Sequence, residues 1–127
     1  MQQFLWICLG GAVGTGARYL LSGWALQALG PAFPYGTLTV NLLGSFLIAF
    51  LMVVGVETTL LPPALRLVLA TGVMGGFTTY SAFSYETLKY LQEGAWWIGI
   101  LNVLVTVFGC LAACLFGWVS ARWLVGP

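Results

Sequence analysis

The sequence has 127 residues, of which 61% are hydrophobic and 6% are charged, and its formal net charge is +1. Soluble domains carry roughly 25% charged residues, and a water-soluble protein this small could not bury so much apolar surface. The small net charge gives no electrostatic case for nucleic-acid binding, and the absence of histidine removes a common metal ligand and proton relay. The composition therefore predicts one all-α integral membrane domain over residues 1–127, in contact with the lipid bilayer.

The first apolar run, residues 4–26, is long enough to cross a hydrocarbon core about 30 Å thick. Within it, Gly10 and Gly14 form a pair of small residues four positions apart, which lets a second helix approach closely. Arg18 follows at a depth where a charge is costly. It can snorkel to the interface, pair with a protein group or attract an anion, and the sequence leaves these roles open.

A connector rich in glycine and proline ends this helix and leads into the second predicted span, residues 37–56. Thr37, Asn41 and Ser45 recur every four residues, so they form a polar stripe on an otherwise apolar helix. The Asn41 amide brings two N–H donors to mid-membrane. Such groups either bind neighbouring helices or line a path, and the spacing alone favours neither.

The third predicted span, residues 65–91, would be roughly 40 Å long if helical throughout, which exceeds the hydrocarbon thickness. In its middle the chain reads Gly-Val-Met-Gly-Gly-Phe-Thr-Thr-Tyr-Ser-Ala-Phe-Ser-Tyr-Glu. Paired glycines and successive hydroxyl residues weaken a helix, so we expect a break between Gly75 and Ser81. Broken helices expose backbone carbonyls and form ion sites in membrane proteins, which makes this stretch the leading candidate site.

Beyond the expected break, Tyr80, Phe83 and Glu86 fall on one helical face. An aromatic stripe at helical spacing is usually core packing, but this stripe adjoins the break and ends in a carboxylate. The fourth predicted span, residues 95–119, has tryptophans near both ends, as expected at membrane interfaces. One of its faces is polar or small, with Asn102, Thr106, Cys110 and Cys114 at four-residue spacing.

Four spans would place both termini on one side of the membrane, and the positive side chains divide almost evenly between the sides. Arg66 and Arg122 fall on the side of the termini, whereas Lys89, and Arg18 if it snorkels, fall on the other. This near-tie does not fix an orientation, so the chain can insert both ways. A dual-topology chain can form an antiparallel homodimer with a two-fold axis in the membrane plane.

The chain resembles the Fluc (CrcB) family of fluoride channels over all four predicted spans. The resemblance rests on three motifs, of which the last is the most specific: Gly10-Gly11-x-x-Gly14-x-x-x-Arg18-Tyr19, Gly36-Thr37-Leu38-x-Val40-Asn41-x-x-Gly44 and Gly72-x-x-Gly75-Gly76-x-Thr78-Thr79-Tyr80-Ser81-x-Phe83-Ser84-x-Glu86. Two departures stand out. The first is in the third motif, where Tyr80 replaces the usual phenylalanine and Ala82 replaces the usual threonine. The second is that the fourth span lacks an obvious pore-facing tyrosine, for which Asn102 or Thr106 could substitute.

The resemblance implies an antiparallel homodimer in the bacterial inner membrane with two fluoride pores. It also implies a structural sodium ion on the two-fold axis, held by backbone carbonyls of Gly75 and Thr78 from each subunit. Carried over position by position, the expected pore and fluoride-binding residues are Arg18, Thr37, Asn41, Tyr80, Ser81, Phe83, Ser84 and Glu86.

The residues themselves suit this chemistry. Fluoride holds its water tightly, and amide N–H groups, hydroxyls and the positive edges of aromatic rings can replace that shell. The carbonyls freed by a broken helix suit a hard cation instead. The main alternative, a small multidrug-type proton-coupled exporter, needs a carboxylate inside the first helix, but the only acids are Glu57, Glu86 and Glu93. A non-transporting assembly subunit would leave the break without purpose, and no nucleophile–base pair supports an enzyme.

Overall fold

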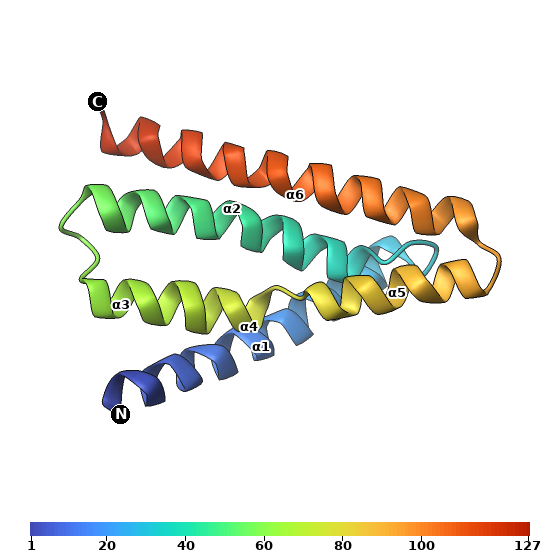
Figure 1. Cartoon of the computed structure of the whole chain (residues 1–127), viewed down its shortest axis with the longest axis horizontal. Helices are drawn as coiled ribbons and strands as arrows, with labels where there is room; N and C mark the ends of the chain where they lie inside the picture. The colour runs from blue at the N-terminus through green and yellow to red at the C-terminus, as the bar shows by residue number, and fades with distance from the viewer.

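The computed structural model describes residues 1–127 and is all-helical, which confirms the all-α part of the predicted fold class. The four spans and the antiparallel pairing stay predictions. Three helices are each long and apolar enough to cross a membrane: α1 (Gln2–Leu29), α2 (Tyr35–Glu57) and α6 (Trp96–Val125). Between α2 and α6, four shorter segments follow one another along a single line (Figure 1): α3 (Pro63–Leu67), the π-helical turn η1 (Val68–Met74), α4 (Gly75–Phe77) and α5 (Tyr80–Gln92).

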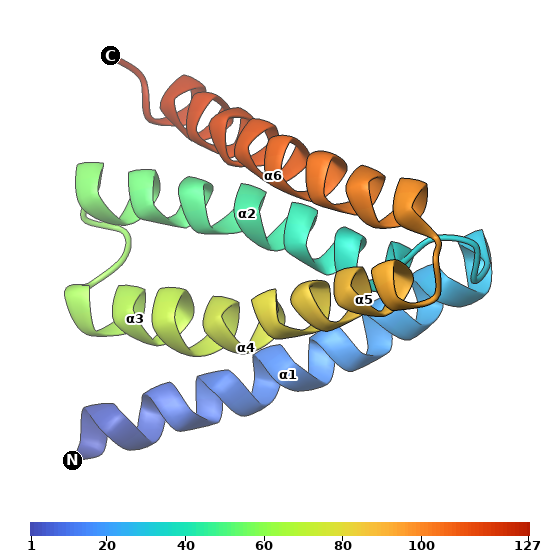
Figure 2. The ribbon, with the colours of Figure 1, turned by 45° about the vertical axis from the view of Figure 1, so that its right-hand side comes forward.

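Helices α1 and α2 extend past their predicted membrane spans at both ends, and α6 extends past its predicted span at the C-terminal end. A helix can continue beyond the hydrocarbon into the interface, so the limits of the spans stay predictions. Near the termini, the segmented run lies between α2 and α1, and α6 packs on the far side of α2 (Figures 1 and 2). At the opposite end, α5 packs against α6 and α1 contacts α2. Both chain termini lie at one end of the bundle together with the α2–α3 connector, and the other two connectors lie at the opposite end (Figure 2).

Helix α1 packs against η1 and α4 with almost no side chain between the backbones. A Cβ added to Gly14 would collide with the carbonyl oxygen of Val73, and one added to Gly76 would collide with that of Gly11. At Gly10 an added Cβ would lie 3.0 Å from a backbone oxygen of η1. Glycine is therefore required on both sides of this contact, which confirms the close helix approach expected from the small-residue pair.

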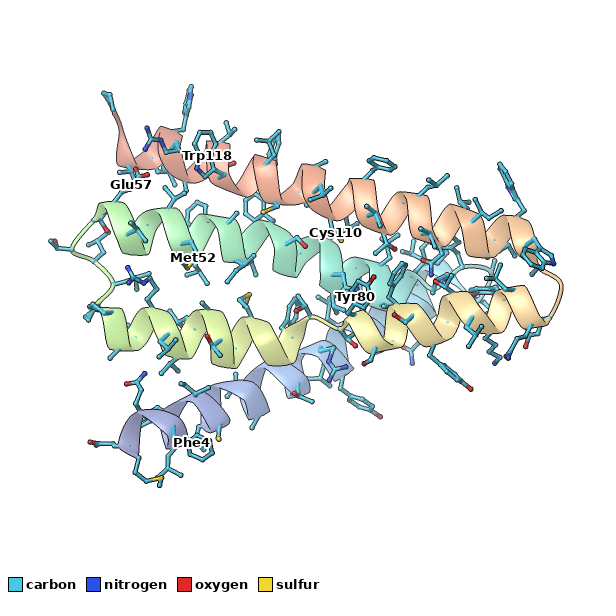
Figure 3. All side chains as sticks on the ribbon, in the orientation of Figure 1. Phe4, Met52, Glu57, Tyr80, Cys110 and Trp118 are labelled. Atoms are coloured by element: carbon cyan, nitrogen blue, oxygen red, sulfur yellow. The ribbon has the colours of Figure 1, made fainter.

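At the end that carries the termini, an exposed ion pair joins α6 to the end of α2. Arg122 Nη1 lies 2.7 Å from both carboxylate oxygens of Glu57, and its guanidinium carbon lies 5.7 Å from the centre of the Trp118 ring. Glu57 and Trp118 lie together at this end, whereas Tyr80 and Cys110 lie near the middle of the bundle (Figure 3). The candidate site therefore lies near the middle of the bundle, away from this ion pair.

Candidate functional site

The segmented run leaves helical geometry at two residues. Thr78 has φ −90° and ψ 159°, and Thr79 has φ −150° and ψ 116°, so both are extended. The Thr79 hydroxyl then accepts a hydrogen bond from the Ala82 amide at 3.2 Å and thereby caps the N-terminus of α5. The interruption lies inside the range from Gly75 to Ser81 that the sequence predicts.

Asn41 of α2 binds the backbone at this interruption. The Thr79 amide donates to Asn41 Oδ1 at 2.8 Å, and Asn41 Nδ2 donates to the Thr79 carbonyl at 2.9 Å. The side chain is 8% exposed, so water competes little for these bonds. Asn41 therefore replaces the backbone partners that Thr79 would have in a continuous helix. The sequence leaves two roles open for Asn41, binding a neighbouring helix or lining a path, and the structure shows the first.

Among the backbone carbonyls at the break, those of Gly75 and Thr78 lose their normal helical donors to other acceptors. In an α-helix the carbonyl of residue i accepts from the amide of residue i+4. The donor for Gly75 would be the Thr79 amide, which goes to Asn41, and the donor for Thr78 would be the Ala82 amide, which goes to the Thr79 hydroxyl. A Cβ added to Gly75 would meet nothing within 4 Å, so space is open beside this residue.

Arg18 contacts the same segment from the other side. Its Nε donates to the carbonyl of Gly76 at 3.0 Å, from α1 to α4. The positive charge thus lies at the C-terminal end of a helical segment, where the helix dipole favours a cation. Among the roles that the sequence leaves open for Arg18, the structure shows pairing with a protein group.

A central cavity of about 490 Å³ lies between α2, the segmented run and α6. Five of the predicted site residues line it: Asn41, Gly75, Thr78, Tyr80 and Phe83. The two aromatic rings meet edge to face, with centroids 5.4 Å apart and an interplanar angle of 69°. Phe83 is 6% exposed and Tyr80 is 78% exposed, so one ring is buried inside the bundle and the other lies at its surface.

A second cavity of about 620 Å³, here called the end cavity, lies where α1, α2 and α5 meet the first connector. Thr37 and Glu86 line it, and the Thr37 hydroxyl donates to Glu86 Oε1 at 2.6 Å. Glu86 Oε2 is buried and has no hydrogen-bond partner in the protein. Tyr19, Trp24 and Tyr90 form part of the same wall. These two predicted residues are therefore separated from the central cavity.

The two predicted serines face outward and line neither cavity. Ser84 Oγ donates to the Tyr80 carbonyl at 3.0 Å, and Ser81 Oγ lies 3.3 Å from the Thr79 hydroxyl. Within one chain, the structure therefore gives these hydroxyls local backbone and side-chain partners only.

A buried polar chain connects α6 to α5 behind Phe83. Thr106 Oγ1 donates to Asn102 Oδ1 at 3.3 Å, Asn102 Nδ2 donates to Thr87 Oγ1 at 3.0 Å, and Thr87 Oγ1 donates to the Phe83 carbonyl at 2.8 Å. Thr106 also lines the central cavity. The sequence indicates the polar face of α6 but gives no sign that Thr87 completes this connection.

Sequence reasoning also missed Met74 and Cys110 as residues of the central cavity. For Cys110, the four-residue spacing from Thr106 is a signal that places both on one face of α6. For Met74 no such signal exists, because its position depends on the π-helical turn.

Comparison with known proteins gives a consistent result along the chain. Residues 5–118 match the family model described as CrcB-like protein, Camphor Resistance (CrcB). A protein of Anaeromyxobacter dehalogenans (strain 2CP-1) is 54% identical over 126 residues, covering 99% of this chain and 100% of the relative. Proteins of Sorangium cellulosum and Geobacter metallireducens are 50% and 49% identical over 98% of this chain and 98% and 100% of their own lengths. All three are named fluoride-specific ion channel FluC.

Proposed function

The chain belongs to the CrcB family, and on that premise we propose that it is a fluoride-selective channel that lets fluoride leave the bacterial cytoplasm passively. The family is one of ion channels and not of enzymes. The observation that carries the proposal is the central cavity, where a helix break, a buried amide and an edge-to-face aromatic pair meet inside an otherwise apolar bundle.

The lining of this cavity suits a small anion that must give up its water. Asn41 Nδ2 has two N–H groups and the structure gives it one acceptor, so the second N–H is available to an anion. The rings of Tyr80 and Phe83 can add the positive edges of their C–H groups. A passage closed by Phe83 would favour fluoride over larger halides by size.

The remaining predicted residues are assigned to the approaches of the pore. Thr37 and Glu86 would line a vestibule at the end cavity, and Arg18 would add a positive potential close to it. Ser81 and Ser84 would offer hydroxyls on the outer face of α5, where a second copy of the chain can bring its own cavity wall.

We further propose that the segmented run crosses the plasma membrane as a fourth span and that two copies pair antiparallel, with two pores between them. Space is open beside Gly75, and Tyr80 is 78% exposed in the middle of the bundle, as expected of a face that meets a partner. The near-even division of positive side chains supports insertion in both orientations.

The residues at the break also fit a structural sodium ion. The carbonyls of Gly75 and Thr78 have no helical donor, and carbonyl oxygens are the ligands that hard cations prefer. Both residues line the central cavity, so a second copy could bring an equivalent pair of carbonyls. When bound, sodium would supply a fixed positive charge that favours an anion nearby.

Efflux from proteoliposomes tests the proposal. Vesicles loaded with potassium fluoride or potassium chloride, with a potassium ionophore to balance charge, should release fluoride rapidly and chloride negligibly, as followed with ion-selective electrodes. Equal release of both halides would contradict selectivity. Release that requires an imposed proton gradient would instead favour the exporter, although α1 contains no Asp or Glu.

A further inference from the structure

The carbonyls of Gly75 and Thr78 lose their helical donors for different reasons. Thr78 loses its donor to a local cap, because the Ala82 amide donates to the hydroxyl of the adjacent Thr79. Gly75 loses its donor to another helix, because the Thr79 amide donates to Asn41 Oδ1 on α2. Only the second arrangement depends on a residue that is distant in sequence.

We propose that Asn41 is a positioning residue for the cation at the break, and that it keeps the Gly75 carbonyl available by holding the Thr79 amide away from it. This inference rests on the sodium site of the proposed function. The two bonds between Asn41 and Thr79, at 2.8 and 2.9 Å, match both backbone groups of Thr79 and hold it in its extended conformation.

Without Asn41, the Thr79 amide would have to find another acceptor. A buried N–H is rarely left unpaired, and the Gly75 carbonyl is the acceptor that a continuous helix would offer it. If Thr78 and Thr79 returned to helical angles, the Thr79 amide would form this hydrogen bond with the Gly75 carbonyl. A cation would then have to break it before binding, so its apparent affinity would fall.

An ordinary role in helix packing predicts something different, namely a loss of stability with no link to cations. Asn102 provides a matched control for that role. It is the same residue type, it is 1% exposed, and it bonds to the side chains of Thr87 and Thr106 and not to the break. The substitutions Asn41→Leu and Asn102→Leu each replace one buried amide with an apolar side chain of similar shape.

The experiment measures the melting temperature of the purified protein as sodium replaces N-methyl-D-glucamine at constant ionic strength. Wild type should be stabilised by sodium, because an ion that binds only the folded state raises its stability. Asn102→Leu should have a lower melting temperature than wild type at every sodium concentration. The sodium concentration that gives half of the stabilisation should be the same as for wild type. Asn41→Leu should need about five- to tenfold more sodium for the half-maximal effect, the factor expected for breaking one hydrogen bond.

Asn41→Asp separates this role from the pore. The carboxylate keeps an acceptor for the Thr79 amide, so the sodium dependence should remain, although the added negative charge should stop fluoride efflux. If Asn41→Leu does not assemble, the smaller Asn41→Ala, which also lacks an acceptor for the Thr79 amide, replaces it with the same expected result.

A wild-type sodium dependence in Asn41→Leu, or its loss in Asn41→Asp, would overturn the inference and leave the sodium site standing. Wild type that gains no stability from sodium would remove the sodium site itself, and with it the inference. Fluoride efflux is measured separately, so failure of the channel function would be recognised on its own.

Discussion

Gly75 and Gly76 are neighbours in the chain but face different surroundings. A Cβ on Gly76 would collide with the Gly11 carbonyl of α1, whereas a Cβ on Gly75 would meet nothing within 4 Å. Successive residues point about 100° apart around a helix, so one segment has a closed face against α1 and an open face toward the central cavity. Glycine thus serves packing on one face, while on the other it leaves space for an ion or a second copy.

Substitution of the two glycines by alanine should give the largest difference. Gly76→Ala forces two backbones apart, and we expect little or no folded protein. Overpacking of this kind lowers the free energy of unfolding by about 1–3 kcal/mol or more. Gly75→Ala should leave the fold of each single chain intact, since its φ of −60° and ψ of −40° are helical and alanine improves helix propensity by about 1 kcal/mol. The yield of monodisperse protein in detergent measures both, and equal yields would remove the distinction between the faces.

On the open face, Phe83→Ile should reduce fluoride efflux by about tenfold or more while the protein remains folded. Isoleucine keeps the apolar bulk of a side chain that is 6% exposed but removes the positive ring edge. Proteoliposome efflux gives the rate, and size exclusion shows whether the oligomer is retained. Wild-type efflux in well-folded Phe83→Ile would assign this ring to packing.

If the open face meets an antiparallel copy, chains must be present in both orientations. In a background in which the three native cysteines are replaced, a thiol introduced by Pro127→Cys should react with an impermeant reagent in about half the chains of intact cells. The other half should react only after the membrane is permeabilised. Complete labelling from one side would exclude the antiparallel pair.

The smallest effect is expected at the outward-facing ring. Tyr80→Phe keeps the ring edge and removes only a hydroxyl from a side chain that is 78% exposed, so fluoride efflux should stay within about twofold of wild type. The same efflux assay measures it beside Phe83→Ile. A large loss would show that the hydroxyl itself contacts the anion or the partner.

Sequence patterns predicted those parts of the structure that depend on local chemistry. Long apolar runs predicted the three long helices, and the Gly-Gly and Thr-Thr pairs predicted an interruption that the structure has at Thr78 and Thr79. The close approach of α1 followed from the spacing of Gly10 and Gly14.

Features that depend on tertiary packing could not be predicted in this way. Helical spacing puts Tyr80 and Phe83 on one face, yet their exposed fractions are 78% and 6%, because the packing of the bundle buries only one of them. Likewise, the bonds between Asn41 and Thr79 join residues 38 positions apart, and spacing within one helix carries no information about them. The separation of Glu86 from the central cavity has the same cause.

The position of the two termini at one end of the bundle decides how two copies can be joined in a single polypeptide (Figure 1). An even number of crossings returns the chain to the side on which it began. With the four spans proposed above, a tandem fusion with a water-soluble linker would force its two halves to insert in parallel, whereas a linker that contains one additional apolar helix of about 20 residues would force them antiparallel. In these two fusions the linker would determine whether the two copies are parallel or antiparallel.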